Sequence, residues 1–146
     1  MWSIIRKKQN KKGEEGFTLI ELIVVIAILG FLLAIAIPRY TTSRAKAAVT
    51  SSAANLKNLA NAIELYATEK NLATYPADGD FTTVIETYIP GPPKTPGGNT
   101  YTYAQTDSGA GYQITDPDAY PAAKVDANGL YITEGGIIHG LSLIHI

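Results

Sequence analysis

Few residues of this 146-residue chain have the type and spacing that catalysis requires. There is no Cys, the two His stand at positions 139 and 145, and no phosphate-binding loop, dinucleotide-binding or zinc-binding pattern occurs. We therefore predict that the chain is not an enzyme and uses no cofactor.

Four oxygen-bearing side chains in the C-terminal third could ligate calcium: Asp116, Asp118, Asp126 and Asn128. The run 126–129 lacks the remaining ligands of a known calcium-binding loop. Its last two residues, Asn128 and Gly129, form a strong turn dipeptide. We expect turns here and no metal site.

One carboxylate stands in an unusual environment, because Glu21 lies inside a long apolar run. Residues 17–37 hold 18 apolar residues out of 21. As a helix this run is about 31 Å long, which matches the hydrocarbon thickness of a bilayer. A charge at the centre of a membrane-spanning helix costs about 2.5–3.5 kcal/mol. Glu21 therefore needs a partner, unless its side chain reaches the lipid headgroups.

The flanking charges set the orientation of this run. Residues 1–16 form a basic leader with five basic and two acidic residues, whereas the next basic residues are Arg39, Arg44 and Lys46. By the positive-inside rule, the N-terminus stays in the cytoplasm and the chain after Pro38 is exported. We expect a single-pass protein of the cytoplasmic (inner) membrane with its C-terminus outside.

Two simple interpretations of this N-terminus stay open. A cleaved secretory signal has a shorter apolar core, of roughly 7–15 residues, followed by a small-x-small site such as 34–36 supplies. A plain uncleaved anchor explains the length and orientation of the run but not Glu21.

A third interpretation comes from the residues around Glu21, which resemble the N-terminal region of type IV pilins and of the pseudopilins of type II secretion. The shared features are a basic leader, the run Gly16-Phe17-Thr18-Leu19-Ile20-Glu21, Gly30, and Pro38 followed by Arg39-Tyr40. The resemblance is tight from about residue 11 to residue 40 and generic afterwards. It implies that a membrane-embedded prepilin peptidase cuts after Gly16 and methylates the new N-terminal residue, Phe17.

The resemblance also implies roles in assembly. In this family the glutamate is taken to pair with the N-terminal amine of a neighbouring subunit, so Glu21 would set subunit register. Opposite charges about 4 Å apart attract by about 4 kcal/mol at an effective dielectric constant of 20. The stretch between Gly30 and Pro38 is expected to loosen as subunits pack. Because Pro cannot donate to the carbonyl group of Ala34, we also predict a kink near Pro38.

The function implied is a structural subunit of a type IV pilus or of a type II secretion-like filament, polymerised through its N-terminal helix. Its partners would be identical or homologous pilin subunits, the prepilin peptidase, the assembly platform of the inner or cytoplasmic membrane, and membrane lipid before assembly. The filament itself would be extracellular or periplasmic. The sequence does not distinguish between a major pilin, a minor pilin, a pseudopilin and a competence pilin. A role in DNA uptake is possible only if the chain is a competence pilin. The alternative is a monomeric membrane-anchored binding module outside the cytoplasm.

The segment 38–74 predicts an amphipathic continuation of the helix. Side chains at alternating spacings of three and four form an apolar stripe suited to packing on a small sheet, namely Ala45, Val49, Ser52, Leu56, Leu59, Ile63 and Tyr66. The polar residues elsewhere on this helix are expected to face solvent or a neighbouring subunit: Lys57, Asn58, Asn61, Glu64 and Lys70.

Residues 75–99 form a Pro- and Gly-rich connecting loop with one short element near 81–89. In the small antiparallel β region, 100–140, a hairpin is expected from 100–105 and 112–115, and a third strand from 130–133. The fold class is therefore α+β and pilin-like: a long N-terminal helix, membrane-spanning in its first half and amphipathic in its second, packed on a small antiparallel sheet. Nine Tyr against three Phe suggest half-buried rings whose hydroxyl groups reach water or a neighbour.

The overall composition excludes other classes. A net charge of -1 gives no reason to expect nucleic-acid binding, and 46% hydrophobic residues exclude a disordered chain. Without Cys, the fold must rest on packing alone.

The final run 141–146, Leu-Ser-Leu-Ile-His-Ile, matches one reading frame of a widely used transposon-end sequencing adapter. We expect native sequence to end near Gly140. A genuine edge strand is the other interpretation, which the β propensity of the run would permit.

Overall fold

The computed structural model describes residues 16–123 and 125–141 of the chain. The chain divides into two compact units, Met1–Pro38 and Arg39–Ile146. The leader before Gly16 and residues 142–146 lie outside the described residues, so the predictions made for them stay predictions.

A single helix of 51 residues, α1 (Leu19–Glu69), begins in the first unit and continues through Pro38 into the second. Every described residue of the first unit is exposed, although most of its side chains are apolar. This part of α1 is long and apolar enough to cross a membrane. The kink near Pro38 stays a prediction, because this residue stands at the boundary between the two units.

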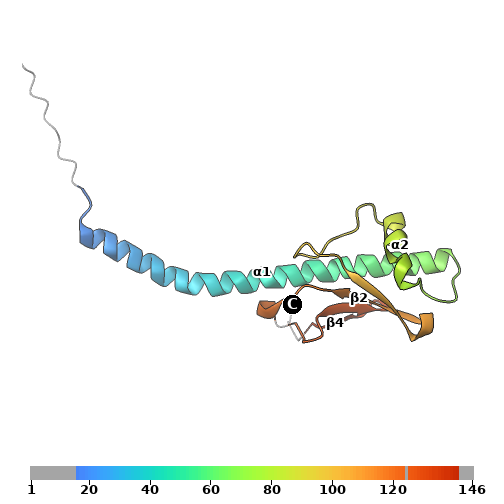
Figure 1. The fold of residues 1–146 in the computed structure, drawn as a ribbon. Coiled ribbons are helices and arrows are strands. Elements are labelled where there is room, and N and C mark those ends of the chain that lie inside the picture. Colours follow the sequence, from blue (N-terminus) through green and yellow to red (C-terminus); the bar gives the residue numbers. More distant parts are fainter. Residues whose placement is uncertain (1–15, 124, 142–146) are drawn as a thin grey trace, which may run out of the picture. The chain divides into compact units, whose positions relative to one another are not determined.

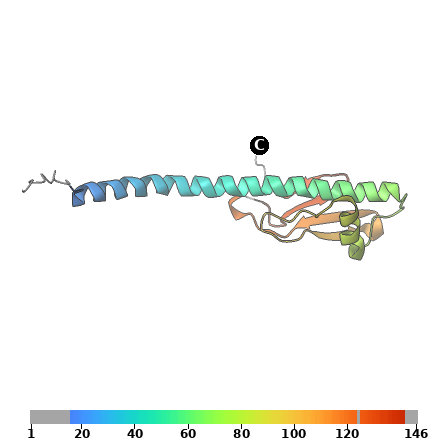
Figure 2. The ribbon, with the colours of Figure 1, turned by 90° about the horizontal axis from the view of Figure 1, so that it is seen from above.

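The second unit packs the remainder of α1 against an antiparallel sheet (Figures 1 and 2). The strands are β1 (Thr102–Thr106), β2 (Gly111–Asp116), β3 (Leu130–Thr133) and β4 (Ile138–His139), and they lie in that order. The predicted α+β class is confirmed. The predicted number of strands is wrong, because β4 adds a fourth strand of two residues.

The turn between β1 and β2 has the chemistry that the sequence predicts. The register pairs Thr102 with Thr115 and Thr106 with Gly111. Between the strands, three successive residues, 107–109, have positive φ angles of 48°, 55° and 96°. Asp and Ser tolerate this left-handed region better than bulky residues do, and Gly adopts it freely. The turn therefore closes the hairpin in the predicted place.

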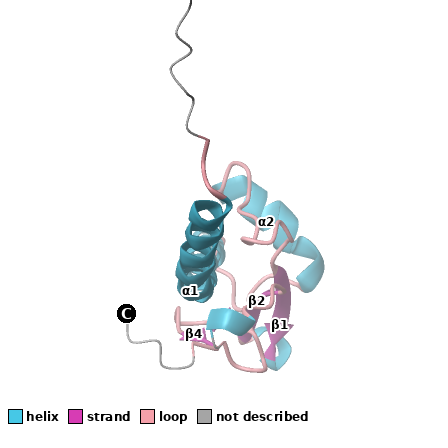
Figure 3. Cartoon of the chain, turned by 90° about the vertical axis from the view of Figure 1, so that its left-hand side faces the viewer, coloured by secondary structure: helices cyan, strands magenta, loops and turns pink. Residues whose placement is uncertain are grey.

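The core of the second unit lies between α1, the sheet and a short helix, α2 (Phe81–Tyr88). Figure 3 looks along α1, with α2 and the sheet beside it. The predicted stripe of α1 is confirmed: Val49, Ser52, Leu56, Leu59 and Ile63 are buried, and Ala45 and Tyr66 are partly buried. Opposite them, the sheet contributes Tyr112, Ile114, Leu130 and Ile132. Fully burying one aliphatic side chain of this size contributes about 1.5–3 kcal/mol.

The connecting segment contacts the outer edge of β1 at one backbone N–H group. The backbone N–H of Gln105 donates a hydrogen bond of 2.6 Å to the Oδ1 atom of Asp78. Asp78 belongs to the short 3-10 helix Asp78–Asp80 that precedes α2. The connecting segment thus holds the edge strand as well as linking α1 to the sheet.

The tyrosines lie deeper than the sequence indicates. Tyr101, Tyr112 and Tyr120 are buried, and their hydroxyl groups form hydrogen bonds inside the unit rather than reaching water. The ring of Tyr103 stacks between Phe81 and Tyr112, with ring centroids 4.9 and 5.9 Å away. The prediction of half-buried rings with outward hydroxyls is wrong for the three buried residues, because the stripe on α1 leaves room for large rings above it.

Alkaline solution should destabilise this unit. Burial, with a smaller contribution from the nearby Asp78 charge, raises the pKa of Tyr103 from 10.0 to about 12. Between these values the unfolded chain releases a proton that the folded chain retains, so the free energy of unfolding falls as pH rises. Denaturant unfolding followed by circular dichroism, at about pH 9 and about pH 11, should show this fall. Tyr103→Phe cannot ionise and should reduce the fall; an unchanged pH dependence in this variant would contradict the assignment.

Candidate functional site

The predicted processing site lies on an accessible, non-helical segment. Residues 16–18 are not helical, and α1 begins at Leu19. Phe17 is 89% exposed, and nothing lies within 4 Å of the place where a Cβ atom of Gly16 would stand. A peptidase binds its substrate as an extended backbone, and a residue without a side chain allows the closest approach. The geometry is therefore suited to cleavage between Gly16 and Phe17.

Glu21 closes the N-terminus of α1 as part of a capping box. The backbone N–H of Thr18 donates to Oε2 of Glu21 at 2.8 Å, and the Thr18 hydroxyl group donates to the same oxygen at 2.7 Å. In return, the backbone N–H of Glu21 donates to the Thr18 hydroxyl oxygen at 3.3 Å. Such a box supplies partners for N–H groups that have none inside the helix. The spacing Thr-x-x-Glu predicts this contact, and our sequence analysis missed it.

The other predicted assembly residues do not gather around Glu21. Gly30 and Pro38 both lie inside α1. At 1.5 Å per residue they stand about 13 and 25 Å further along the helix. No atom lies within 4 Å of a Cβ atom built on Gly30, so this residue leaves an open spot on the helix surface. The predicted assembly residues are thus distributed along one helix and do not form a compact site.

A buried carboxylate joins α1 to the sheet in the second unit. Asp116, at the end of β2, is only 2% exposed. Its oxygen atoms accept hydrogen bonds from the hydroxyl groups of Ser52 and Tyr120 and from the backbone N–H of Asp118. The Tyr101 hydroxyl group lies 3.1 Å from that of Ser52 and extends the network. The bond from the Asp118 N–H, two residues further on, is the turn chemistry expected of Asp116. Its burial and its bonds to Ser52 and Tyr120 were not predicted; they arise because the alternation of β2 turns this side chain inward.

The other three oxygen-bearing residues lie in turns and loops. Asp118 accepts hydrogen bonds from the backbone N–H of Gly97 and the amide group of Asn99, which holds the loop before β1. The backbone N–H of Gly129 donates a hydrogen bond to the carbonyl oxygen of Asp126, with an N to O distance of 2.9 Å, and so closes a turn. Over the residues that the structure describes, no three His, Cys, Asp or Glu side chains are grouped so as to hold a metal ion.

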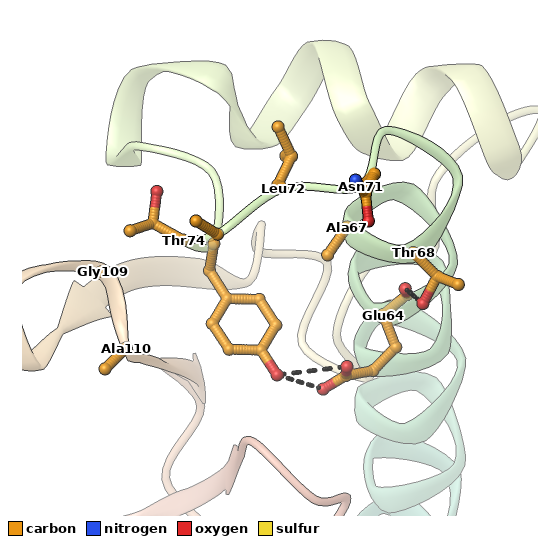
Figure 4. Close-up of a pocket in the computed structure, with 10 residues that line it drawn as sticks. Glu64, Ala67, Thr68, Asn71, Leu72, Thr74, Gly109 and Ala110 are labelled. Atoms are coloured by element: carbon orange, nitrogen blue, oxygen red, sulfur yellow. Dashed lines mark hydrogen bonds between the residues drawn. The ribbon is translucent and has the colours of Figure 1, made fainter.

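A cavity of about 350 Å³ opens at the C-terminal end of α1 (Figure 4). It is bounded by α1, the segment 71–75 and the turn between β1 and β2. Glu64 faces this cavity from α1, and Thr68 stands one turn further along. Its walls combine small apolar side chains with polar ones, so it is suited to a small polar group.

Glu64 accepts hydrogen bonds from two tyrosines: Tyr75, which lines this cavity, and Tyr112, which is fully buried in the core. Each of its carboxylate oxygens lies 3.1 Å from the Tyr75 hydroxyl group, and Oε1 also accepts from Tyr112 at 3.1 Å. Burial, followed by the negative charge of Glu64, raises the pKa of both Tyr75 and Tyr112 above the ordinary value. The sequence did not predict these contacts: Glu64 is half-buried and accepts hydrogen bonds from hydroxyl groups of its own unit, while its side chain still lines the cavity. Within the described ranges, its side-chain partners are hydroxyl groups and not cations.

Comparison with known proteins points to the N-terminal segment. A family model described as "Prokaryotic N-terminal methylation motif" matches residues 11–37. A fimbrial protein of Pseudomonas aeruginosa is 47% identical over 53 residues, which cover 36% of this chain and 34% of that protein. Type IV major pilin protein PilA of Myxococcus xanthus is 45% identical over 67 residues, which cover 46% of this chain and 30% of that protein. Type II secretion system core protein G of P. aeruginosa is 37% identical over 57 residues, which cover 39% of this chain and 40% of that protein.

These matches have a limited extent. The chain spans between 30% and 40% of the length of these three relatives. No solved structure matches the chain. The motif nevertheless coincides with the exposed apolar part of α1, the Thr18–Glu21 box and the accessible Gly16. Residues 11–37 thus carry the prokaryotic N-terminal methylation motif, and this part of the chain is similar to the corresponding part of a type IV major pilin and of a type II secretion core protein.

Proposed function

We propose that this chain is a structural subunit of a type IV pilus or of a type II secretion-like filament. The observation that carries the proposal is the methylation motif at 11–37, which overlaps the first part of α1, residues 19–38, where every apolar side chain is exposed. A run of about 21 residues that is mostly apolar and exposed within its own chain needs either lipid or other helices around it. A membrane anchor before assembly and a helical filament core after it supply these two environments.

The proposal includes the path by which the chain reaches a filament. A prepilin peptidase cleaves after Gly16 and methylates Phe17 at the cytoplasmic face of the membrane. The remainder of the chain stands outside the cytoplasm, and an assembly platform in the membrane adds subunits to the filament through α1. Identical or homologous subunits are the main partners, and the chain itself performs no catalysis. Relatives named as fimbrial and pilin proteins and as a type II secretion core protein support this path.

Processing depends on the absence of a side chain at Gly16. Gly16→Val should leave a precursor that retains the 16 leader residues, because a branched side chain prevents the close approach of the backbone to a peptidase. Mass spectrometry of the membrane fraction should detect this precursor. The control is Gly13→Val, which adds the same side chain elsewhere in the leader and should be cleaved normally. Cleavage of Gly16→Val at the same bond would contradict the assignment of the site.

The decisive test of the function combines two measurements on the wild-type chain. N-terminal mass analysis should show loss of residues 1–16 and a methyl group on Phe17. Electron microscopy of sheared surface material, with antibodies against residues 39–141, should show labelled filaments. An intact N-terminus without filaments would favour the membrane-anchored binding module and overturn the proposal.

A further inference from the structure

We propose that the cavity beside Glu64 receives a basic side chain from a second copy of the chain, with Lys57 as the side chain that enters. This inference rests on the proposed filament function and names one contact between neighbouring subunits. It joins two features of the second unit: a carboxylate that has no cationic partner among the described residues, and exposed basic residues along one face of the same helix.

The cavity has the chemistry to hold an ammonium group. The Glu64 carboxylate faces it, with Thr68 and Asn71 also lining it. The hydroxyl groups of Tyr75 and Tyr112 hold the carboxylate in place but carry no compensating charge. A half-buried carboxylate interacts more strongly with a cation than one in open water does, because the effective dielectric constant around it is lower. An amine at the end of a flexible stem is suited to reach such a site.

The cationic stripe lies on the exposed surface of α1. Between Glu21 and Glu64 the sequence holds four basic residues and no acidic one. Three of them, Arg39, Lys46 and Lys57, are separated by 7 and 11 residues, spacings that return to nearly the same helical face at 3.6 residues per turn. All three are exposed, and within the described residues none forms an ion pair. Arg44 points about 140° away from Lys57 around the helix axis.

A simple displacement brings the two features together. Lys57 and Glu64 are seven residues apart, so they share a helical face and stand about 10 Å apart along α1. This is too far for contact within one chain. Two parallel copies that face each other and are offset by about 10 Å along their axes place Lys57 of one level with Glu64 of the other. Parallel helices are what polymerisation through α1 requires, so a second copy is the occupant that the charges favour.

Cross-linking tests this arrangement in filaments from cells that make the full chain. The chain has no Cys, so introduced thiols report without interference. Asn61 and Thr68 are exposed, share the face of Lys57 and Glu64, and are also seven residues apart. The double variant Asn61→Cys, Thr68→Cys should form a disulfide-linked ladder under a mild oxidant. In the matched control, Asn58→Cys replaces Asn61→Cys and points about 100° away from Lys57 and about 60° away from position 61, so its ladder should be much weaker.

Charge variants in the double-Cys background decide whether the ion pair is responsible. Lys57→Glu should reduce the cross-linked fraction at least fivefold through like-charge repulsion, and Glu64→Gln should reduce it while keeping an oxygen acceptor for the tyrosines. Arg44→Glu, on the other face, should leave it unchanged. Circular dichroism confirms that each variant folds.

The outcomes separate this inference from the proposed function. Filaments with methylated Phe17 but no Asn61–Thr68 ladder would overturn the inference and leave the filament function intact. A ladder unaffected by Lys57→Glu would equally overturn it, because the contact would then not depend on charge. Absence of filaments and an intact N-terminus in the wild type would overturn the proposed function itself.

Discussion

Cells that produce Glu21→Ala should contain a cleaved, membrane-inserted protein but no filaments. Gly16 and Phe17 are unchanged in this variant, and removal of a charge makes the apolar run easier to insert. Assembly is different, because in the proposed filament each subunit would bring its new N-terminal amine from the membrane into an apolar core of helices. In the absence of Glu21 this amine has no carboxylate partner, and an unpaired charge in such surroundings is very unfavourable. Electron microscopy and mass spectrometry measure the two halves of this prediction.

The capping box gives Glu21 a second role, in the stability of α1. A matched control must separate this role from charge pairing between subunits. Thr18 and Glu21 close the start of α1, and loss of such a cap costs about 1 kcal/mol. Glu21→Gln keeps an oxygen acceptor in the position that the box requires but removes the charge. If charge pairing between subunits is the cause, Glu21→Gln should lack filaments as Glu21→Ala does. Normal filaments from Glu21→Gln would assign the effect of Glu21→Ala to the lost cap instead.

Asp116→Ala should strongly destabilise the second unit. It removes the acceptor of the Ser52 and Tyr120 hydroxyl groups and of the Asp118 backbone N–H, all close to a carboxylate that is 2% exposed. Each buried donor left without a partner costs about 1–3 kcal/mol, and water that enters the site compensates part of this. We expect the free energy of unfolding to fall by about 3 kcal/mol, measured by denaturant unfolding of the full chain in detergent.

Two further substitutions show whether the network or the packing is responsible. Ser52→Ala removes one donor and leaves the carboxylate with the Tyr120 hydroxyl group and the Asp118 N–H, so it should cost about 1 kcal/mol. Asp116→Asn keeps the shape and one carbonyl oxygen, so its effect should lie between those of Ser52→Ala and Asp116→Ala. A loss below about 1 kcal/mol for Asp116→Ala would contradict the role of the network.

The long helix and the hairpin were predictable because local chemistry determines them. Residues 39–69 contain no Gly or Pro, and their apolar side chains recur at spacings of three and four. The glycine-rich turn fixes the register of β1 and β2 in the same local way. Strand β4 is different: it has two residues, Ile138 and His139, and depends on β3 for its pairing. No period can be recognised in so short a run.

The candidate site was predictable at the N-terminus and not in the second unit. Gly16, Phe17 and Glu21 are close in the sequence, so their spacing alone indicates a processing motif. The partners of Glu64 are 11 and 48 residues away, at Tyr75 and Tyr112. Ser52 and Asp116 are separated by 64 residues. Contacts of this kind arise from tertiary packing, and a period in one helix cannot indicate which distant hydroxyl groups will reach its polar side chains.

The hydrogen bond between Asp78 and the backbone of Gln105 has a consequence for crowded surfaces. An open sheet edge is a template on which a strand of another chain can pair, and such pairing leads to aggregation. The sheet ends at β1 on one side and at the two-residue β4 on the other. The Asp78 carboxylate occupies one outward N–H group of β1 and adds a negative charge beside it. Pairing between the β1 edge strands of neighbouring copies is therefore less favourable, even at very high local protein density. This opposes the formation of a continuous amyloid-like sheet.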